Sequence, residues 1–276
     1  MVAGVIGTAA NIGILLFATL AKEVAIKPDD WRWAPLFAAW PIVLGVFALF
    51  AVPESPRWLA ARDAPKIEAS PASGSVFRPP LLSVTLIAIV LATVPIIGGW
   101  GVSNWMNPWA DQAGDALEPP NPYLKAQLGQ ARSLTGIVGS LLGGWIASAL
   151  GRRLTYFLVS LVSLGLAQYM FVFLYPTDES FLYWVAALGF VSGIYFGWLP
   201  LCLPELFPTR VRSTGAGVGF NFGRIVTAVT LFVAGALMAW FDSDYARIGR
   251  VTSLLFILGM VFIWFAPDTS KKELED

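Results

Sequence analysis

The sequence predicts an all-α membrane protein with about eight transmembrane helices. Apolar residues make up 57% of its 276 residues and charged residues only 13%, a balance unlike that of a soluble domain. Apolar runs of about 20 residues recur along the chain, and a helix of about that length crosses a bilayer. The predicted spans are 2–20, 33–52, 81–109, 127–150, 153–175, 181–204, 214–240 and 247–266.

The composition also excludes several functional classes. The formal net charge is zero, so no basic surface for a nucleic acid is expected. The chain has no histidine and one cysteine, Cys202, which gives no basis for a metal site, a His-based triad or a cofactor. Neither an H-E-x-x-H motif nor a G-x-S-x-G motif occurs, so we predict no enzyme. The expected partners are the lipid bilayer and a small-molecule solute.

A polar segment between the second and third spans predicts a division of the chain. Residues 63–80 are rich in Pro, Ala and Ser, as expected of a linker between two bundles. The loops on the linker side carry more Lys and Arg than those on the other side. The positive-inside rule therefore places the linker and the C-terminal tail in the cytoplasm.

Two pairs of spans resemble each other in sequence. The first span carries Gly7, Asn11 and Gly13, and the seventh carries Gly217, Asn221 and Gly223 at the same spacing. Pro-Glu-Ser at 53–55 follows the second span, and Pro-Asp-Thr at 267–269 follows the eighth. A duplication of this kind predicts a repeat of six helices.

With eight spans, such a repeat predicts two unequal parts. Residues 1–62 would hold the last two helices of an N-terminal bundle, and residues 81–276 a complete six-helix C-terminal bundle with a cytoplasmic tail. The first four helices would then be lacking.

Four motifs resemble one known family: PESPRWL at 53–59, GRRL at 151–154, PELFPTRVRSTG at 204–215 and PDTSKKELED at 267–276. Together they resemble the major facilitator superfamily, most closely its sugar-porter-like and metabolite–proton symporter branches. The resemblance implies a partial two-bundle major-facilitator fold in a cell (inner or plasma) membrane. It also implies alternating-access transport of a small polar solute, a sugar or a small organic anion, with a coupled proton.

Two departures from the family weaken a hexose assignment. Ser148 stands where the loop signature usually has Asp, and the span 81–109 lacks the usual Gln pair. An alternative is a truncated, non-transporting fragment of such a carrier, because four missing helices would leave half of the cavity wall open.

Arg224 is the first candidate for a functional residue. It lies about ten residues into an apolar span, near mid-bilayer, where a charge costs about 2.5 to 3.5 kcal/mol unless it faces a wet or paired interior. Asn221, one turn earlier, would share the same lumen. An anionic solute would offset the cost through bidentate hydrogen bonds. Alternatively, Arg224 bonds the carbonyls of a kinked neighbour and only stabilises the bundle.

Other spans supply further candidates for solute contact. Trp100 and Asn104 lie one turn apart in a span that Pro95 and nearby glycines should bend. Tyr195 and Trp198 precede a proline and either stack on a solute ring or pack in the core. Arg132 either meets an anion at the outer vestibule or extends to the headgroups. The predicted substrate contacts are Asn11, Trp100, Asn104, Arg132, Tyr195, Trp198, Asn221 and Arg224.

Charged residues gather at the predicted cytoplasmic ends of the spans. By the resemblance they form a gating network that closes the inner side of an outward-open carrier. Alternatively, the arginines obey the positive-inside rule and anchor helix ends. The set is Glu54, Arg57, Arg152, Arg153, Glu205, Arg210 and Arg212.

Overall fold

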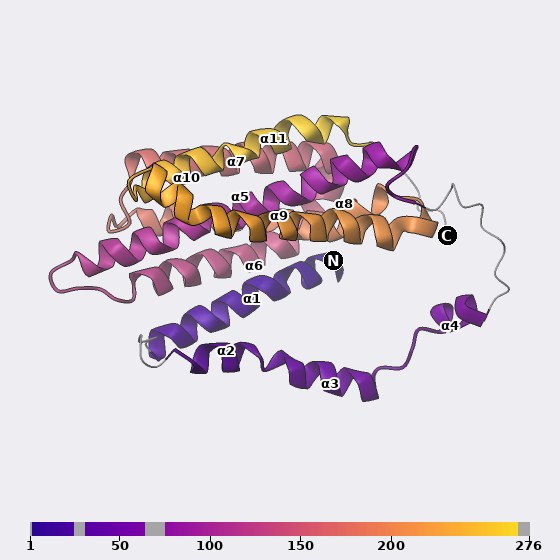
Figure 1. Ribbon diagram of the computed structural model, residues 1–276, viewed down its shortest axis with the longest axis horizontal. Coiled ribbons are helices and arrows are strands. Elements are labelled where there is room, and N and C mark those ends of the chain that lie inside the picture. Colours follow the sequence, from indigo (N-terminus) through magenta and orange to yellow (C-terminus); the bar gives the residue numbers. More distant parts are fainter. Residues whose placement is uncertain (1, 25–30, 64–74, 270–276) are drawn as a thin grey trace. The chain divides into compact units, whose positions relative to one another are not determined.

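The computed structural model describes residues 2–24, 31–63 and 75–269, and all regular elements among them are helices (Figure 1). The described residues hold seven helical segments that are long and apolar enough to cross a membrane, or eight if one bent pair counts as a span. The predicted all-α membrane fold is therefore confirmed. The helices are α1 (Val2–Glu23), α2 (Trp33–Ala38), α3 (Pro41–Ala51), α4 (Pro56–Asp63), α5 (Leu81–Asp115), α6 (Leu124–Leu150), α7 (Arg152–Phe173), α8 (Phe181–Glu205), η2 (Thr209–Val211), α9 (Arg212–Trp240), α10 (Tyr245–Ser253), α11 (Leu255–Phe262) and η3 (Ile263–Phe265).

The chain divides into two compact units, one of residues 1–22 with 75–276 and one of residues 23–74. In the smaller unit, the predicted span 33–52 consists of two helices, because Pro41 starts α3. Neither α2 nor α3 has a buried residue. A helix that is apolar all round suits a hydrocarbon layer or the interior of a bundle. The predicted division at 63–80 stays a prediction, and residues 64–74 of that segment lie outside the described part.

In the larger unit, α5 continues as a helix through Pro95 and Pro108. Proline has no N–H, so the carbonyl of Leu91, four residues before Pro95, lacks its helical donor. The Tyr156 hydroxyl of α7 donates to that carbonyl at 2.9 Å. A buried carbonyl therefore keeps a hydrogen bond, and α5 remains tied to α7 at this point.

Helices α6 and α8 approach each other through glycine. A Cβ on Gly139 would lie 2.0 Å from the Phe190 carbonyl oxygen, and one on Gly193 would lie 2.5 Å from that of Gly136. Ser140 Oγ donates to the Gly193 carbonyl at 3.0 Å. The small residues along α6 thus form a seam against α8, held by close backbone packing.

One residue separates α6 from α7. Gly151 has φ 91°, in the left-handed region, where a side chain would be strained. This conformation reverses the chain within a single residue and starts α7 at Arg152.

Two further contacts place α1 and α9. A Cβ on Gly4 would lie 2.9 Å from the Leu141 carbonyl oxygen of α6, and Gln130 Nε2 donates to Thr19 Oγ1 at 3.0 Å, so α1 runs antiparallel to α6. On α9, Gly219 and Gly223 lie against α5, so the two helices approach each other closely there.

The core lies among α5, α7, α8 and α11, where Tyr156, Tyr195 and Phe256 are fully buried. Their rings are 5.0 Å apart for Tyr156 and Tyr195, and 6.4 Å for Tyr195 and Phe256. Trp109 of α5 stacks on Phe171 at 5.7 Å and is 7% exposed. Phe171 of α7 and Phe181 of α8 cover this tryptophan, so it belongs to the core.

Candidate functional site

A cavity of about 580 Å³ opens between α1, α5, α8 and α9, all within the larger unit. Two of its lining side chains are polar, Arg224 and Thr227 of α9. The other lining residues are small or apolar: Ile6, Gly7, Ala10, Ile96, Phe196, Leu199, Pro200, Leu203, Pro204, Ala216 and Phe220. A volume of this size is in the usual range for small-molecule sites.

The α1 and α8 walls meet at Gly7. A Cβ there would lie 2.2 Å from the Phe196 carbonyl oxygen, so only glycine permits this approach. Phe196 is four residues before Pro200, which has no N–H to offer that carbonyl. The prolines of α8 and the glycine of α1 therefore shape the same part of the wall.

Arg224 provides the positive charge of the cavity. Its guanidinium lies over the Phe220 ring of the preceding turn, 4.8 Å from the centroid, and the residue is exposed. Thr227, one turn later, donates to the Gly223 carbonyl at 2.8 Å. The cavity therefore presents a cation against an apolar wall, which favours an anionic ligand.

Two ion pairs between described residues are Lys125 with Asp111 and Arg152 with Glu205, and Arg224 belongs to neither of them. Arg224 thus faces the cavity without a described carboxylate beside it.

Asn221 does not share the cavity with Arg224, contrary to the prediction. It is exposed and lies in a shallow hollow formed by described residues of α9, among them Phe222. Its Nδ2 donates to the Gly217 carbonyl at 3.0 Å. The three-residue spacing sets the two side chains about 60° apart around the helix, and the edge of the cavity lies between them.

Tyr195 and Trp198 also lie away from the cavity lining. They are 1% and 2% exposed, and their polar atoms are used inside the bundle. The Tyr195 hydroxyl is 2.6 Å from Ser160 Oγ, and Trp198 Nε1 donates to the Arg152 carbonyl at 2.9 Å. Of the two alternatives, the structure shows core packing.

Asn11 and Arg132 make contacts between helices. Asn11 Nδ2 donates to Ser140 Oγ at 3.4 Å, at the junction of α1 and α6. Arg132 Nη2 donates to the Gly99 carbonyl of α5 at 2.7 Å, which is neither of its two predicted roles. The side chains of Trp100 and Asn104 lie outside the described residues, so their contacts stay predictions.

Two of the predicted gating residues meet at the ends of α7 and α8. Arg152 Nε and Nη2 donate to the two carboxylate oxygens of Glu205 at 3.2 and 3.1 Å. Thr269 Oγ1 donates to the same carboxylate at 2.7 Å. The side chains of Arg152 and Glu205 are 16% and 10% exposed, so this pair is shielded from water.

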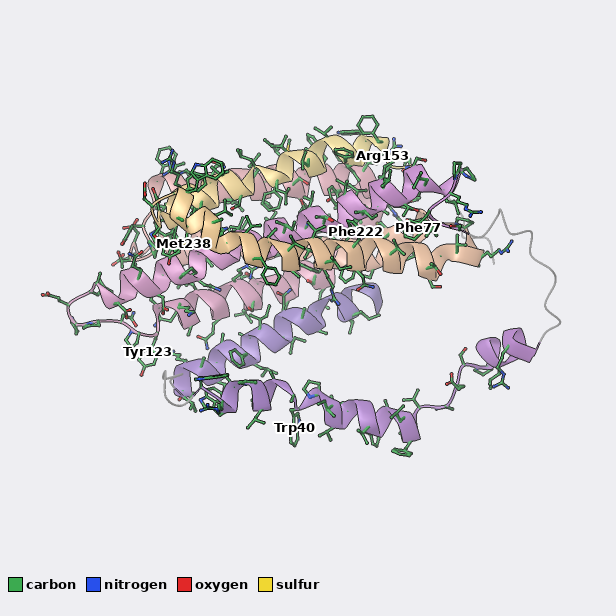
Figure 2. The ribbon with its side chains drawn as sticks, in the orientation of Figure 1. Trp40, Phe77, Tyr123, Arg153, Phe222 and Met238 are labelled. Carbon is green, nitrogen blue, oxygen red and sulfur yellow. The ribbon has the colours of Figure 1, made fainter. Side chains whose placement is uncertain are left out.

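The other predicted gating residues have varied surroundings. Arg153 donates to the Ala266 carbonyl, beyond the end of α11 (Figure 2). Arg210 and Glu54 are exposed, and Arg212 has a buried Nε with no acceptor among the described residues. The side chain of Arg57 lies outside the described part. A single network of all seven residues stays a prediction.

Sequence reasoning missed the apolar wall of the cavity. Phe220 precedes Arg224 by one turn, and Phe196 precedes Pro200 by one turn. Both spacings were readable, but an apolar side chain in an apolar span carries no signal that separates a cavity wall from a packed core.

Comparison of the sequence with known protein families identifies one matching family. The model of the Major Facilitator Superfamily matches residues 1–231. The cis,cis-muconate transport protein of Acinetobacter baylyi is 28% identical over 231 residues, covering 80% of this chain and 54% of that protein. The inner membrane metabolite transport protein YhjE of Escherichia coli is 25% identical, covering 96% and 60%. The glucose transporter GlcP of Staphylococcus epidermidis is 23% identical, covering 96% and 66%. The chain thus spans little more than half the length of the first two relatives.

Proposed function

Since the chain belongs to the major facilitator superfamily, we propose that it serves in a secondary transporter that moves a small polar solute, a sugar or a small organic anion, by alternating access. It is an integral membrane protein of a transporter family, not an enzyme. The observation that carries the proposal is the cavity between α1, α5, α8 and α9, with Arg224 on its wall. The proposal includes coupling of solute transport to a proton, because the motifs resemble those of metabolite–proton symporters.

The ion pair at the helix ends supplies a means of switching. Arg152 and Glu205 are shielded from water in this conformation, so separating them would cost several kcal/mol unless water or other groups replaced the contact. A few kcal/mol suffices to decide which of two states is populated. We propose that this pair holds one state of the transport cycle, with the linker and C-terminal tail in the cytoplasm.

Ligand-induced thermal stabilisation of the purified protein tests the proposed site. Sugars and small organic anions are compared, and at least one class should raise the melting temperature of the wild type. Arg224→Gln should abolish that shift, because it removes the charge on the wall. Arg247→Gln is the matched control, since that guanidinium also lies over a ring, Phe241, at 5.3 Å but outside the cavity. An unchanged shift in Arg224→Gln would refute the role of Arg224.

Uptake measurements separate transport from the alternative of a non-transporting fragment. Cells that express this chain are compared with cells that express an Arg224→Gln variant at equal abundance. Uptake of the stabilising solute by the wild type alone supports a carrier. Binding without uptake favours the fragment.

A further inference from the structure

We propose that the cavity takes an organic acid whose carboxylate is attached to an apolar body, in preference to a sugar. The inference rests on the proposed transport function and narrows its solute class. It comes from the division of the wall into one cationic point, Arg224, and a broad apolar surface.

The apolar surface determines the body of the ligand. Ile96 of α5, Phe196 and Leu199 of α8 and Phe220 of α9 contribute large apolar side chains to the wall. A hydroxyl group of a sugar that moves from water to such a wall loses its hydrogen bonds to water and finds no new partner, which is unfavourable. A ring or alkyl body instead gains from the burial of its surface. The wall therefore selects for an apolar body.

The guanidinium determines the charged end. Arg224 lies over the Phe220 ring at 4.8 Å, which limits the orientations of its planar group. Guanidinium binds a carboxylate through two parallel hydrogen bonds, a geometry that a lysine ammonium does not offer. Thr227, on the next turn, uses its hydrogen toward Gly223. The carboxylate is thus expected at Arg224, with the body extending toward α5 and α8.

Four probes separate charge from body: benzoate, benzamide, glucuronate and glucose. Benzamide has the ring of benzoate without the charge, and glucuronate has the charge on a polar body. Binding to the purified chain in lipid nanodiscs should be at least tenfold tighter for benzoate than for each of the others. Arg224→Gln should weaken benzoate binding at least tenfold and leave benzamide binding unchanged. Arg247→Gln should change neither.

A second pair of variants tests the wall itself. Ile6→Asn places an amide on the cavity lining, whereas Val5→Asn places one on the neighbouring position of α1 outside it. Ile6 and Val5 are 67% and 58% exposed, so neither change empties a packed core. Ile6→Asn should weaken benzoate binding several-fold, and Val5→Asn should leave it unchanged.

The outcomes distinguish this inference from the proposed function. Binding of glucose or glucuronate as tight as that of benzoate, lost in Arg224→Gln, overturns the apolar-body inference and leaves the solute site standing. Binding of benzamide as tight as that of benzoate overturns the role of the carboxylate. Binding that no cavity variant alters overturns both the inference and the proposed function.

Discussion

Arg152 and Glu205 meet through two nitrogen–oxygen contacts, and a third group, the Thr269 hydroxyl, donates to the same carboxylate. The three residues come from the start of α7, the end of α8 and the segment after η3. The carboxylate therefore has partners on two sides, which offsets part of the cost of removing it from water. Loss of Arg152 leaves a shielded carboxylate without its cationic partner.

A double-mutant cycle measures this contact. Arg152→Ala should lower the free energy of unfolding by about 3 kcal/mol, because it leaves the Glu205 carboxylate uncompensated. The double variant with Glu205→Ala should lose less than the sum of the single variants. Unfolding free energies in micelles provide the measurement.

The exposed pair Lys125 and Asp111 serves as the control. Both side chains are 51% exposed, and water screens such pairs, so their coupling energy should be about 0 to 1 kcal/mol. Equal coupling in the two cycles would contradict the shielding of the Arg152 pair.

At the scale of elements, the α6–α8 seam depends on backbone contact rather than on side chains. Gly136 and Gly193 face each other across it, and Ser140 adds a hydrogen bond to the Gly193 carbonyl. Close approach strengthens dispersion along the whole seam, which lipid cannot replace. The seam also forms the surface on which α1 packs.

Substitution of a seam glycine tests this packing. Gly193→Ala should destabilise the protein by about 1 to 3 kcal/mol, because its Cβ would lie 2.5 Å from the Gly136 carbonyl oxygen. Gly165→Ala on α7 is the control, since no atom lies within 4 Å of a Cβ there. That variant should be neutral or more stable by up to about 1 kcal/mol. Equal melting temperatures of the two variants would refute the seam.

The spans were predictable from sequence, but the direction in which individual side chains point was not. Hydropathy acts over a whole helix, so it located α6 and α8. Helix α8 is apolar on all sides, so nothing in its sequence distinguished the core face of Tyr195 from the cavity face of Phe196. Arg224 was predictable because a charge in an apolar span requires a wet or paired surrounding.

At the scale of the whole molecule, the charge bias of the loops predicts the orientation in the membrane. Cys202 is 1% exposed, so a Cys202→Ser background removes a residue that a thiol reagent barely reaches. Single cysteines can then be placed in exposed loops, Glu118→Cys between α5 and α6 and Arg78→Cys before α5.

Labelling of these cysteines tests the orientation. A membrane-impermeant maleimide should label Glu118→Cys in intact cells, and Arg78→Cys only after permeabilisation, because the linker side is predicted to be cytoplasmic. The reverse pattern would invert the proposed topology. Labelling of both in intact cells would contradict a span between them.

Arg132 reaches from α6 to the Gly99 carbonyl of α5 at 2.7 Å. This hydrogen bond from the guanidinium joins the two helices at a point where glycines make the backbone of α5 easier to bend. If this part of α5 moves, either α6 moves with it or the Arg132 guanidinium loses its hydrogen bond inside the bundle. We therefore expect α5 and α6 to move together as one rigid unit during any conformational change.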